Sequence, residues 1–173
     1  MEIKLSPIGY VKNDLKQTTF QQDIDATERK NQNRTKYKQI KQTISELIID
    51  KCYEEMLDGV EAFSHIIVIY WPHLLTDSQR NLRKVHPMGR KDLPIQGIFA
   101  TRSPARPNSI LISTVELLAR QDNILRVKGL EALDKSPILD IKTHIQLSDN
   151  IADPVFPEWV LQIEKDLSVT KIN

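Results

Sequence analysis

Ten consecutive residues, AFSHIIVIYW at positions 62–71, constrain the fold more than any other part of the chain. They are almost all apolar, and most are β-branched or aromatic, which favours an extended strand over a helix. A run of this kind is typical of a strand that is buried on both faces. Five other runs have a strand-like composition: KLSPIGYV, TISELIID, IQGIFATR, SILISTVELLA and NILRVKGL.

The segments between these runs predict a mainly β fold, a small antiparallel β-barrel or curled sheet. QDN at 121–123 separates two of the runs and is typical of a hairpin turn. Residues 13–42 and 72–94 are expected to be long connections. A short C-terminal helix is predicted by apolar residues four positions apart, namely Val155, Trp159, Ile163 and Leu167.

Composition limits the class of protein. The 173 residues are enough for one well-packed domain, and no window approaches the ~18 consecutive apolar residues that a membrane span needs. No export signal is apparent after Met1. Cys52 is the only cysteine, which excludes an internal disulfide and favours a reducing, cytoplasmic location. The 5 glycines are scattered, so a glycine-rich nucleotide-binding loop is excluded.

Positive charge is concentrated in two segments, 29–41 and 80–91, whereas acidic residues gather near the C-terminus. Two basic segments can supply the phosphate contacts that dominate affinity for nucleic acids. The alternative interpretation is that they are solvated loops whose charge serves solubility.

Two arginines stand next to prolines in the segment GIFATRSPARPN at 97–108. Pro104 and Pro107 fix their own φ angles and restrict the preceding residues, so the segment is stiff before any ligand binds. A guanidinium on an ordered backbone is well suited to grip a carboxylate or a phosphate. Arg102 and Arg106 are therefore candidate anion-binding residues, with Asn108 beside them. Pairing with local acidic residues is the alternative.

A second polar group lies in the segment LEALDKSPILDIKTH at 130–144. Strand alternation from Pro137 onward predicts that Asp140, Lys142 and His144 share one face with Ile138. This face could form the wall of a polar pocket, or it could be a solvent-facing stripe with an ion pair between Asp140 and Lys142.

The spacing of the histidines and of the serine in ATRSP excludes two classes of site. No HExxH or Cys/His pattern occurs, so no metal site is predicted. His65 lies within the apolar run and is expected to be a hydrogen-bonded core residue. ATRSP also lacks the flanking glycines of a nucleophile elbow, which argues against a serine hydrolase.

Three long motifs resemble those of the TrmO (YaeB/TsaA-like) family of S-adenosylmethionine-dependent tRNA methyltransferases. They are DGVEAFSHIIVIYW at 58–71, GIFATRSPARPN at 97–108 and GLEALDKSPILDIK at 129–142, and the similarity extends over 3–12 and 44–146. The resemblance implies a β-barrel domain over residues 1–147, with an extension over 148–173 that is helical and packs on the barrel or on a partner. It also implies a homodimer that methylates N6 of the threonylcarbamoyl-modified adenosine next to the anticodon of tRNA.

The resemblance also assigns roles to residues. The S-adenosylmethionine site is expected to include His73, Leu74, Arg102, Ile112, Asp134, Lys135, Ser136 and Pro137. The proton that leaves N6 could pass to any of three groups, Asp134, Asp140 or His144. The basic segments and polar groups, rather than the resemblance, supply the expected tRNA contacts, which are Arg106, Asn108, Lys142, Lys36 and Lys38. For Arg106 the alternative is that it stiffens its own loop.

The chain departs from the family pattern at four places. It has RPNSIL where the family usually has RPNPIG, LDKSP for LDGTP and DIKTH for DIKPY, and an early PRQ is missing from residues 13–30. Two further hypotheses therefore stay open. One is a methyltransferase of the same fold with a different acceptor, such as a small molecule. The other is a non-catalytic RNA-binding relative.

Overall fold

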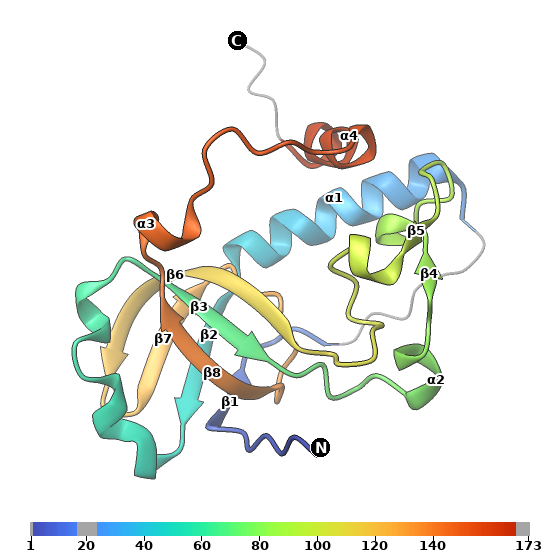
Figure 1. Cartoon of the computed structure of the whole chain (residues 1–173). Helices are drawn as coiled ribbons and strands as arrows, with labels where there is room; N and C mark the ends of the chain where they lie inside the picture. The colour runs from blue at the N-terminus through green and yellow to red at the C-terminus, as the bar shows by residue number, and fades with distance from the viewer. Residues whose placement is uncertain (1, 17–23, 169–173) are drawn as a thin grey trace.

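Six antiparallel strands close into a barrel in the computed structural model, which describes residues 2–16 and 24–168 (Figure 1). The order around the barrel is β1-β2-β7-β6-β3-β8. The strand bounds are β1 Gly9–Lys12, β2 Ile44–Ile49, β3 His65–Tyr70, β6 Leu111–Gln121, β7 Ile124–Lys128 and β8 Pro137–Thr143. The predicted β-barrel is thus confirmed, as is the turn at 121–123, where Asp122 adopts a φ of 52°.

The barrel core is formed by alternate residues of the strands, as the two-residue period of a strand requires. Each such side chain contributes about 1.5–3 kcal/mol by leaving water. The fully buried apolar residues include Val11, Leu47, Ile66, Val68, Val115, Leu125, Val127 and Ile138.

The prediction that β3 is buried on both faces is wrong. Ile66, Val68 and Tyr70 point into the core, whereas Ile67 and Ile69 are only partly buried. Its sequence is apolar at nearly every position because the residues on its outer face, such as Ile67 and Ile69, are apolar although they are not fully buried. His65 is exposed rather than a core histidine, and its Nδ1 lies 2.9 Å from Ser64 Oγ.

Shorter elements connect the strands. Between β3 and β6 lie α2 (Asp77–Arg80), β4 (Lys84–Val85) and β5 (Gln96–Gly97), so most of the run IQGIFATR is not a strand. Single turns of 3₁₀ helix occur at Val60–Ala62, Pro87–Gly89 and Ile98–Ala100, and a longer one at Lys51–Leu57. The helix α3 (Gln146–Asp149) follows β8.

A long helix, α1 (Ala26–Gln42), occupies much of the segment predicted to be a plain connection. The prediction missed it because its inward side is polar: Arg29 and Asn33 are buried and Lys36 is half-buried. Asp25 begins the helix by accepting a 2.9 Å hydrogen bond from the backbone N–H of Glu28. The α1 side chains therefore meet the rest of the protein through hydrogen bonds and charge rather than through an apolar stripe.

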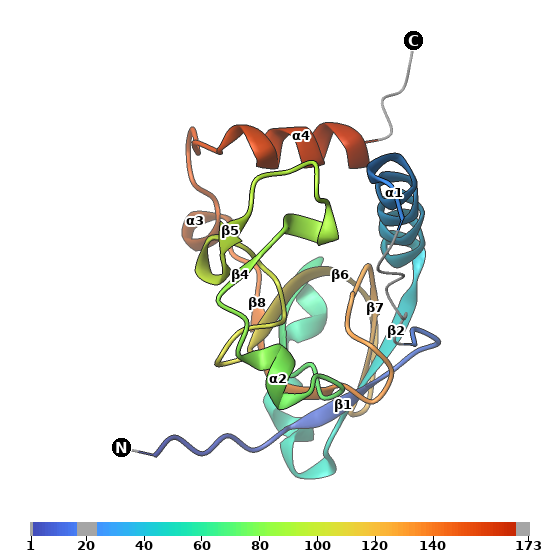
Figure 2. The ribbon, with the colours of Figure 1, turned by 90° about the vertical axis from the view of Figure 1, so that its right-hand side faces the viewer.

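The C-terminal helix α4 (Glu158–Leu167) packs against α1 (Figure 2). Asp166 pairs with Lys30 of α1 at 2.5 Å and with Arg90 at 2.6 Å. Trp159, Ile163 and Leu167 are partly buried, but Val155 precedes the helix and is exposed. The helix is confirmed without Val155, while the boundary after residue 147 stays a prediction. No helix in the described ranges has the length and apolar character needed to cross a bilayer.

Candidate functional site

One end of the barrel gathers most of the residues expected to bind the donor. At this end β3 finishes with Tyr70, which pairs with Leu111 at the start of β6. The backbone N–H of Trp71 donates to Pro137 O at 2.9 Å, where β8 begins. His73, three residues after Tyr70, contacts Ser136 in the turn over 134–137 and is followed by Leu74, while Ile112 is next to Leu111 in β6. We call this region the barrel mouth.

The turn over 134–137 is held rigidly at the barrel mouth. Asp134 Oδ1 accepts from the backbone N–H of Asn13 at 3.1 Å, and the N–H of Lys135 donates to Val11 O at 2.7 Å. Ser136 is only 1% exposed, and its Oγ lies 3.4 Å from His73 Nδ1. The turn and His73 are thus connected directly.

His73 is a half-buried histidine beside a carboxylate. Burial lowers the pKa of its imidazole below 6.5, and the charge of Asp134 opposes that shift without overcoming it. The imidazole is therefore neutral at physiological pH and can accept a hydrogen bond or a proton.

We expect this histidine to make stability depend on pH. Because the folded-state pKa of His73 is depressed, unfolded chains bind a proton below about pH 6.5 that the folded protein does not. The free energy of unfolding therefore decreases as the pH is lowered through that window. Urea unfolding at about pH 7.5 and about pH 5.5 measures the loss, which should be smaller in His73→Gln than in the wild type. An equal loss in the exposed-site control His65→Gln and in His73→Gln would contradict the assignment.

Lys135 occupies a position that suits glycine. Its φ is 63°, in the left-handed region that costs a non-glycine residue about 1–2 kcal/mol, and the family pattern has glycine here. Lys135→Gly should therefore raise the free energy of unfolding by about 0.5–1 kcal/mol, after the larger entropy of an unfolded glycine is subtracted. Urea unfolding measures it. Arg126→Gly in β7 is the control, and it should be destabilising; the same loss in both variants would refute strain at Lys135.

A row of polar side chains in contact with one another inside the barrel mouth was not predicted from the sequence. Tyr70 Oη lies 3.5 Å from Ser113 Oγ, which lies 3.4 Å from Glu131 Oε1. Burial, with the charge of Glu131, raises the pKa of Tyr70, and burial lowers that of Lys36 against the opposing charge of Glu131. Strand alternation alone would have placed Ser113 on the inner face. No pattern in the sequence indicated that α1 approaches this end of the barrel.

The two proline-flanked arginines differ in their surroundings. The Arg106 guanidinium donates to Ser103 O at 2.9 Å, and also to Thr101 O and Ile98 O. It is used to hold its own loop together. Arg102 is exposed, and the described residues offer it no hydrogen bond or ion pair. Arg102 is therefore the arginine that can receive an anionic ligand. Asn108 is exposed on the same loop, and its carbonyl accepts from the Ile110 N–H.

The predicted face of β8, and its alternative of a stripe with an ion pair, are correct for Asp140 and Lys142, but Ile138 is on the other face. An irregularity opposite Ile69 and Tyr70 of β3 shifts the alternation, so Ile138 points inward while Asp140 and Lys142 point outward. Lys142 Nζ pairs with Asp140 Oδ2 at 2.7 Å. His144 lies past the other end of β8, with its ring 6.4 Å from that of His65. The structure thus places Lys142 and His144 towards the far end of β8, whereas Asp140 lies on the outer face opposite Ile69, which also pairs with Ile112.

The two basic segments also divide into inward and outward residues. In α1, Arg34, Lys38 and Lys41 are exposed at helical spacing, whereas Lys36 faces inward. In the second segment, Arg90 is buried in ion pairs, and Arg80 stacks on Trp71 with its guanidinium carbon 4.6 Å from the ring centre. The exposed residues of α1 form a continuous basic face.

The barrel mouth has the mixed chemistry that S-adenosylmethionine requires. Arg102, on the loop that leads into β6, offers a free cation for a carboxylate, and Leu74 and Ile112 are 44% and 46% exposed apolar side chains for an adenine ring. His73 and the turn over 134–137 provide hydrogen-bonding groups. Within 2–16 and 24–168, no cluster of three or more His, Cys, Asp or Glu side chains could hold a metal ion.

Comparison with known proteins gives consistent matches. Residues 25–150 match the model of the tRNA-methyltransferase O N-terminal domain. A probable S-adenosyl-L-methionine-binding protein of Methanothermobacter thermautotrophicus is 39% identical over 87% of this chain and 96% of its own. An S-adenosyl-L-methionine-binding protein of Archaeoglobus fulgidus is 36% identical over 81% of this chain and 88% of its own.

Solved structures agree with this match. TrmO from Pseudomonas aeruginosa superposes with a TM-score of 0.63 at 25% identity, over 90% of this chain and 62% of that protein. The chain therefore spans less than two thirds of the length of the solved TrmO chain. The likeness covers the barrel and most of the segments around it.

Proposed function

Because the chain belongs to the family of tRNA-methyltransferase O N-terminal domains, we propose that it is an S-adenosylmethionine-dependent methyltransferase acting on tRNA. Its acceptor is N6 of the threonylcarbamoyl-modified adenosine next to the anticodon. The observation that carries the proposal is the convergence of His73, Ile112 and the turn over 134–137 at the barrel mouth. Arg102, free of partners in the described chain, completes the set.

The protein's residues act mainly by positioning. When bound, S-adenosylmethionine supplies a methyl group on a positively charged sulfur, and transfer forms an N–C bond as the S–C bond breaks. Holding acceptor and donor in line can contribute about 7–11 kcal/mol. His73, Leu74, Ile112 and the turn would hold the donor, with Arg102 on its carboxylate. N6 also loses a proton, and we assign its acceptance to Asp134 because Asp140 is paired with Lys142 on the outer face and His144 lies past the far end of β8.

The exposed residues of α1 support tRNA as the partner. Arg34, Lys38 and Lys41 can each meet a backbone phosphate, and they do so on one face of one helix. Of the contacts expected from the sequence, Lys38 fits this role better than the inward-facing Lys36. Partly exposed apolar residues on the outer face of β3, Ile67 and Ile69, favour association of two copies into a homodimer. We place the reaction in the cytoplasm, where mature tRNA is found.

Arg102→Ala should weaken S-adenosylmethionine binding about tenfold to over a hundredfold, the effect of losing a charge-assisted hydrogen bond of about 1.5–3 kcal/mol. Titration calorimetry measures the affinity, and circular dichroism checks that the barrel is folded. Arg106→Ala is the matched control. It should lower the melting temperature, because Arg106 holds the loop, and should affect donor affinity less. Wild-type affinity in folded Arg102→Ala would refute the role of Arg102.

Nucleoside analysis of tRNA from a strain that lacks the gene tests the function itself. The N6-methylated form of the threonylcarbamoyl adenosine should be absent and should return with the wild-type gene. An unchanged nucleoside profile, together with donor binding in calorimetry, would instead support a different acceptor. No heat with the donor at millimolar concentration would support the non-catalytic RNA-binding relative.

A further inference from the structure

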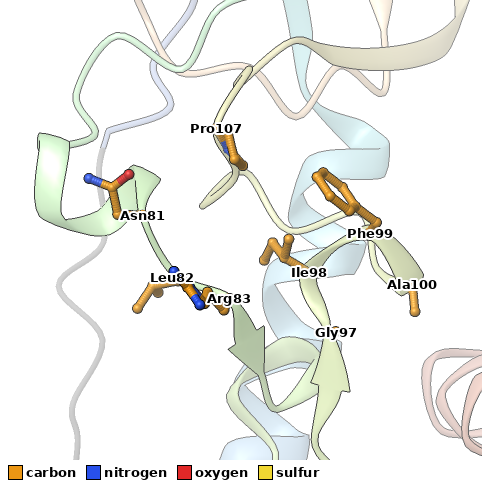
Figure 3. Close-up of a pocket in the computed structure, with 8 residues that line it drawn as sticks. All are labelled: Asn81, Leu82, Arg83, Gly97, Ile98, Phe99, Ala100 and Pro107. Atoms are coloured by element: carbon orange, nitrogen blue, oxygen red, sulfur yellow. The ribbon is translucent and has the colours of Figure 1, made fainter.

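A pocket of about 420 Å³ lies beside the loop that carries Arg102, outside the residues assigned to the donor (Figure 3). One wall is the segment Asn81–Arg83, which leads into β4. The other is formed by residues 97–100 with Pro107. A 2.9 Å hydrogen bond from the Ile98 N–H to Arg83 O joins the two walls. The pocket is therefore part of the framework and not a gap between independent loops.

The lining of this pocket is apolar and includes an exposed aromatic ring. Ile98 is buried, whereas Phe99 is 81% exposed and Leu82 is 44% exposed. In Figure 3 the side chains of Phe99, Ile98 and Pro107 border the same space, with Leu82 opposite. A phenylalanine left in water at the rim of an apolar pocket indicates a surface that contacts something else.

The charge around the pocket points to an anionic partner. Arg83 lines it and Lys84 follows, and both are exposed, with no side-chain partner in the described chain. No acidic residue lines the pocket. Proteins bind unpaired nucleotides by stacking the base on an aromatic side chain and neutralising the phosphate with a nearby cation. Phe99 and the unpaired cations beside it provide this combination. An acidic residue would be expected at a surface made for a basic protein segment.

The pocket is fixed in relation to Arg102 by a single side chain. The guanidinium of Arg106 contacts both Ile98 O and Thr101 O, which flank Phe99 and Ala100, and it also binds Ser103 O at 2.9 Å. Phe99 and Arg102 are thus held three residues apart on one stiffened segment. A ligand in the pocket therefore has a set position relative to the backbone of Arg102.

We propose that this pocket binds a second, non-reacting nucleotide of the RNA, with its base stacked on Phe99 and its phosphate against Arg83. This inference rests on the proposed function, since it takes RNA as the acceptor. It gives the pocket a role in recognition: a loop nucleotide near the target is captured here while the target adenosine enters the barrel mouth.

The test uses an anticodon stem-loop RNA with the fluorescent base 2-aminopurine at each unpaired loop position in turn. For at least one position other than the target, binding to wild-type protein should quench the fluorescence by stacking. Phe99→Leu should abolish that quenching and weaken RNA binding about tenfold, while Phe99→Trp should retain both. Arg83→Gln should reduce the slope of log affinity against log salt by about 0.7.

Two controls separate this inference from the function on which it rests. Phe63→Leu removes an exposed aromatic ring from a different pocket, and it should leave RNA affinity unchanged. Donor affinity should be the same in Phe99→Leu and wild type.

If the wild type binds RNA and Phe99→Leu binds it equally well, the pocket holds no base, so this inference fails while the proposed function stands. If the wild type binds donor but no RNA, both fail. If Phe99→Leu converts a dimer into monomers in ultracentrifugation, the pocket receives a second copy instead, and the inference is overturned.

Discussion

Asp134→Asn should lower the rate of methyl transfer about a hundredfold or more, since a positioned proton acceptor typically contributes 10²- to 10⁴-fold. The substitution is close to isosteric, and asparagine Oδ1 can still accept the hydrogen bond from the Asn13 N–H. It removes the negative charge next to His73 and with it the capacity to take the proton from N6. The loss should therefore fall on turnover rather than on the fold.

Single-turnover transfer of a labelled methyl group to tRNA measures this effect, with the melting temperature as the check on folding. Asp140→Asn is the matched control, because Asp140 pairs with Lys142 on the outer face of the barrel. It should stay within a few-fold of the wild type, as an exposed ion pair contributes only about 0–1 kcal/mol. Equal losses in the two variants, or no loss in Asp134→Asn, would remove Asp134 from the chemistry.

Arg90→Met should lower the free energy of unfolding by about 3–5 kcal/mol, the cost of breaking a buried ion pair from one side. Arg90 is only 3% exposed and binds Asp92 and Asp166, each through a 2.6 Å contact. Burial raises the pKa of Asp166, but Lys30 and Arg90 outweigh it and bring that pKa below its usual value. Without Arg90, Lys30 is the one partner left to the carboxylate of Asp166 among the described residues.

Urea unfolding followed by tryptophan fluorescence is the measurement, and Trp159 in α4 reports on the affected region. Arg83→Met is the control, since Arg83 is exposed and should cost less than about 0.5 kcal/mol. The double variant Arg90→Met/Asp166→Leu should recover part of the lost free energy of unfolding. In this variant the carboxylate of Asp166, which would lack its partner Arg90, is removed as well. A cost below about 1 kcal/mol for Arg90→Met would show that the ion pairs do not secure α4.

The barrel could be predicted from the sequence because its strands follow the two-residue period and its tightest turn has the expected residues. TISELIID and NILRVKGL became β2 and β7 almost as written. α1 could not be predicted in this way, because its buried residues are Arg29 and Asn33, whose partners are supplied by tertiary structure. Asn33, for example, donates to Met88 O at 3.0 Å, 55 positions further along the chain.

The candidate site was predictable only in part. The motifs identified the turn over 134–137 and His73, and the structure brings them together at the barrel mouth. In β8 the alternation rule held for Asp140 and Lys142 but not for Ile138, because an irregularity of one residue separates Ile138 from the face that they share. The sequence left two roles open for Arg106, a contact with the acceptor or stiffening of its own loop. Only the carbonyl oxygens around Arg106 distinguish them, and the folded loop is what brings those oxygens within reach.

The closed barrel restricts how the protein can associate with other chains. Because each of its six strands is hydrogen-bonded on both sides, none of them offers an unpaired edge to which a foreign strand could add. A second copy, or a protein partner, must therefore bind the barrel through side chains, and its specificity depends on shape and charge at the surface. The same closure protects the chain against edge-to-edge aggregation, so an exposed apolar residue such as Ile112 can be tolerated on its outer face.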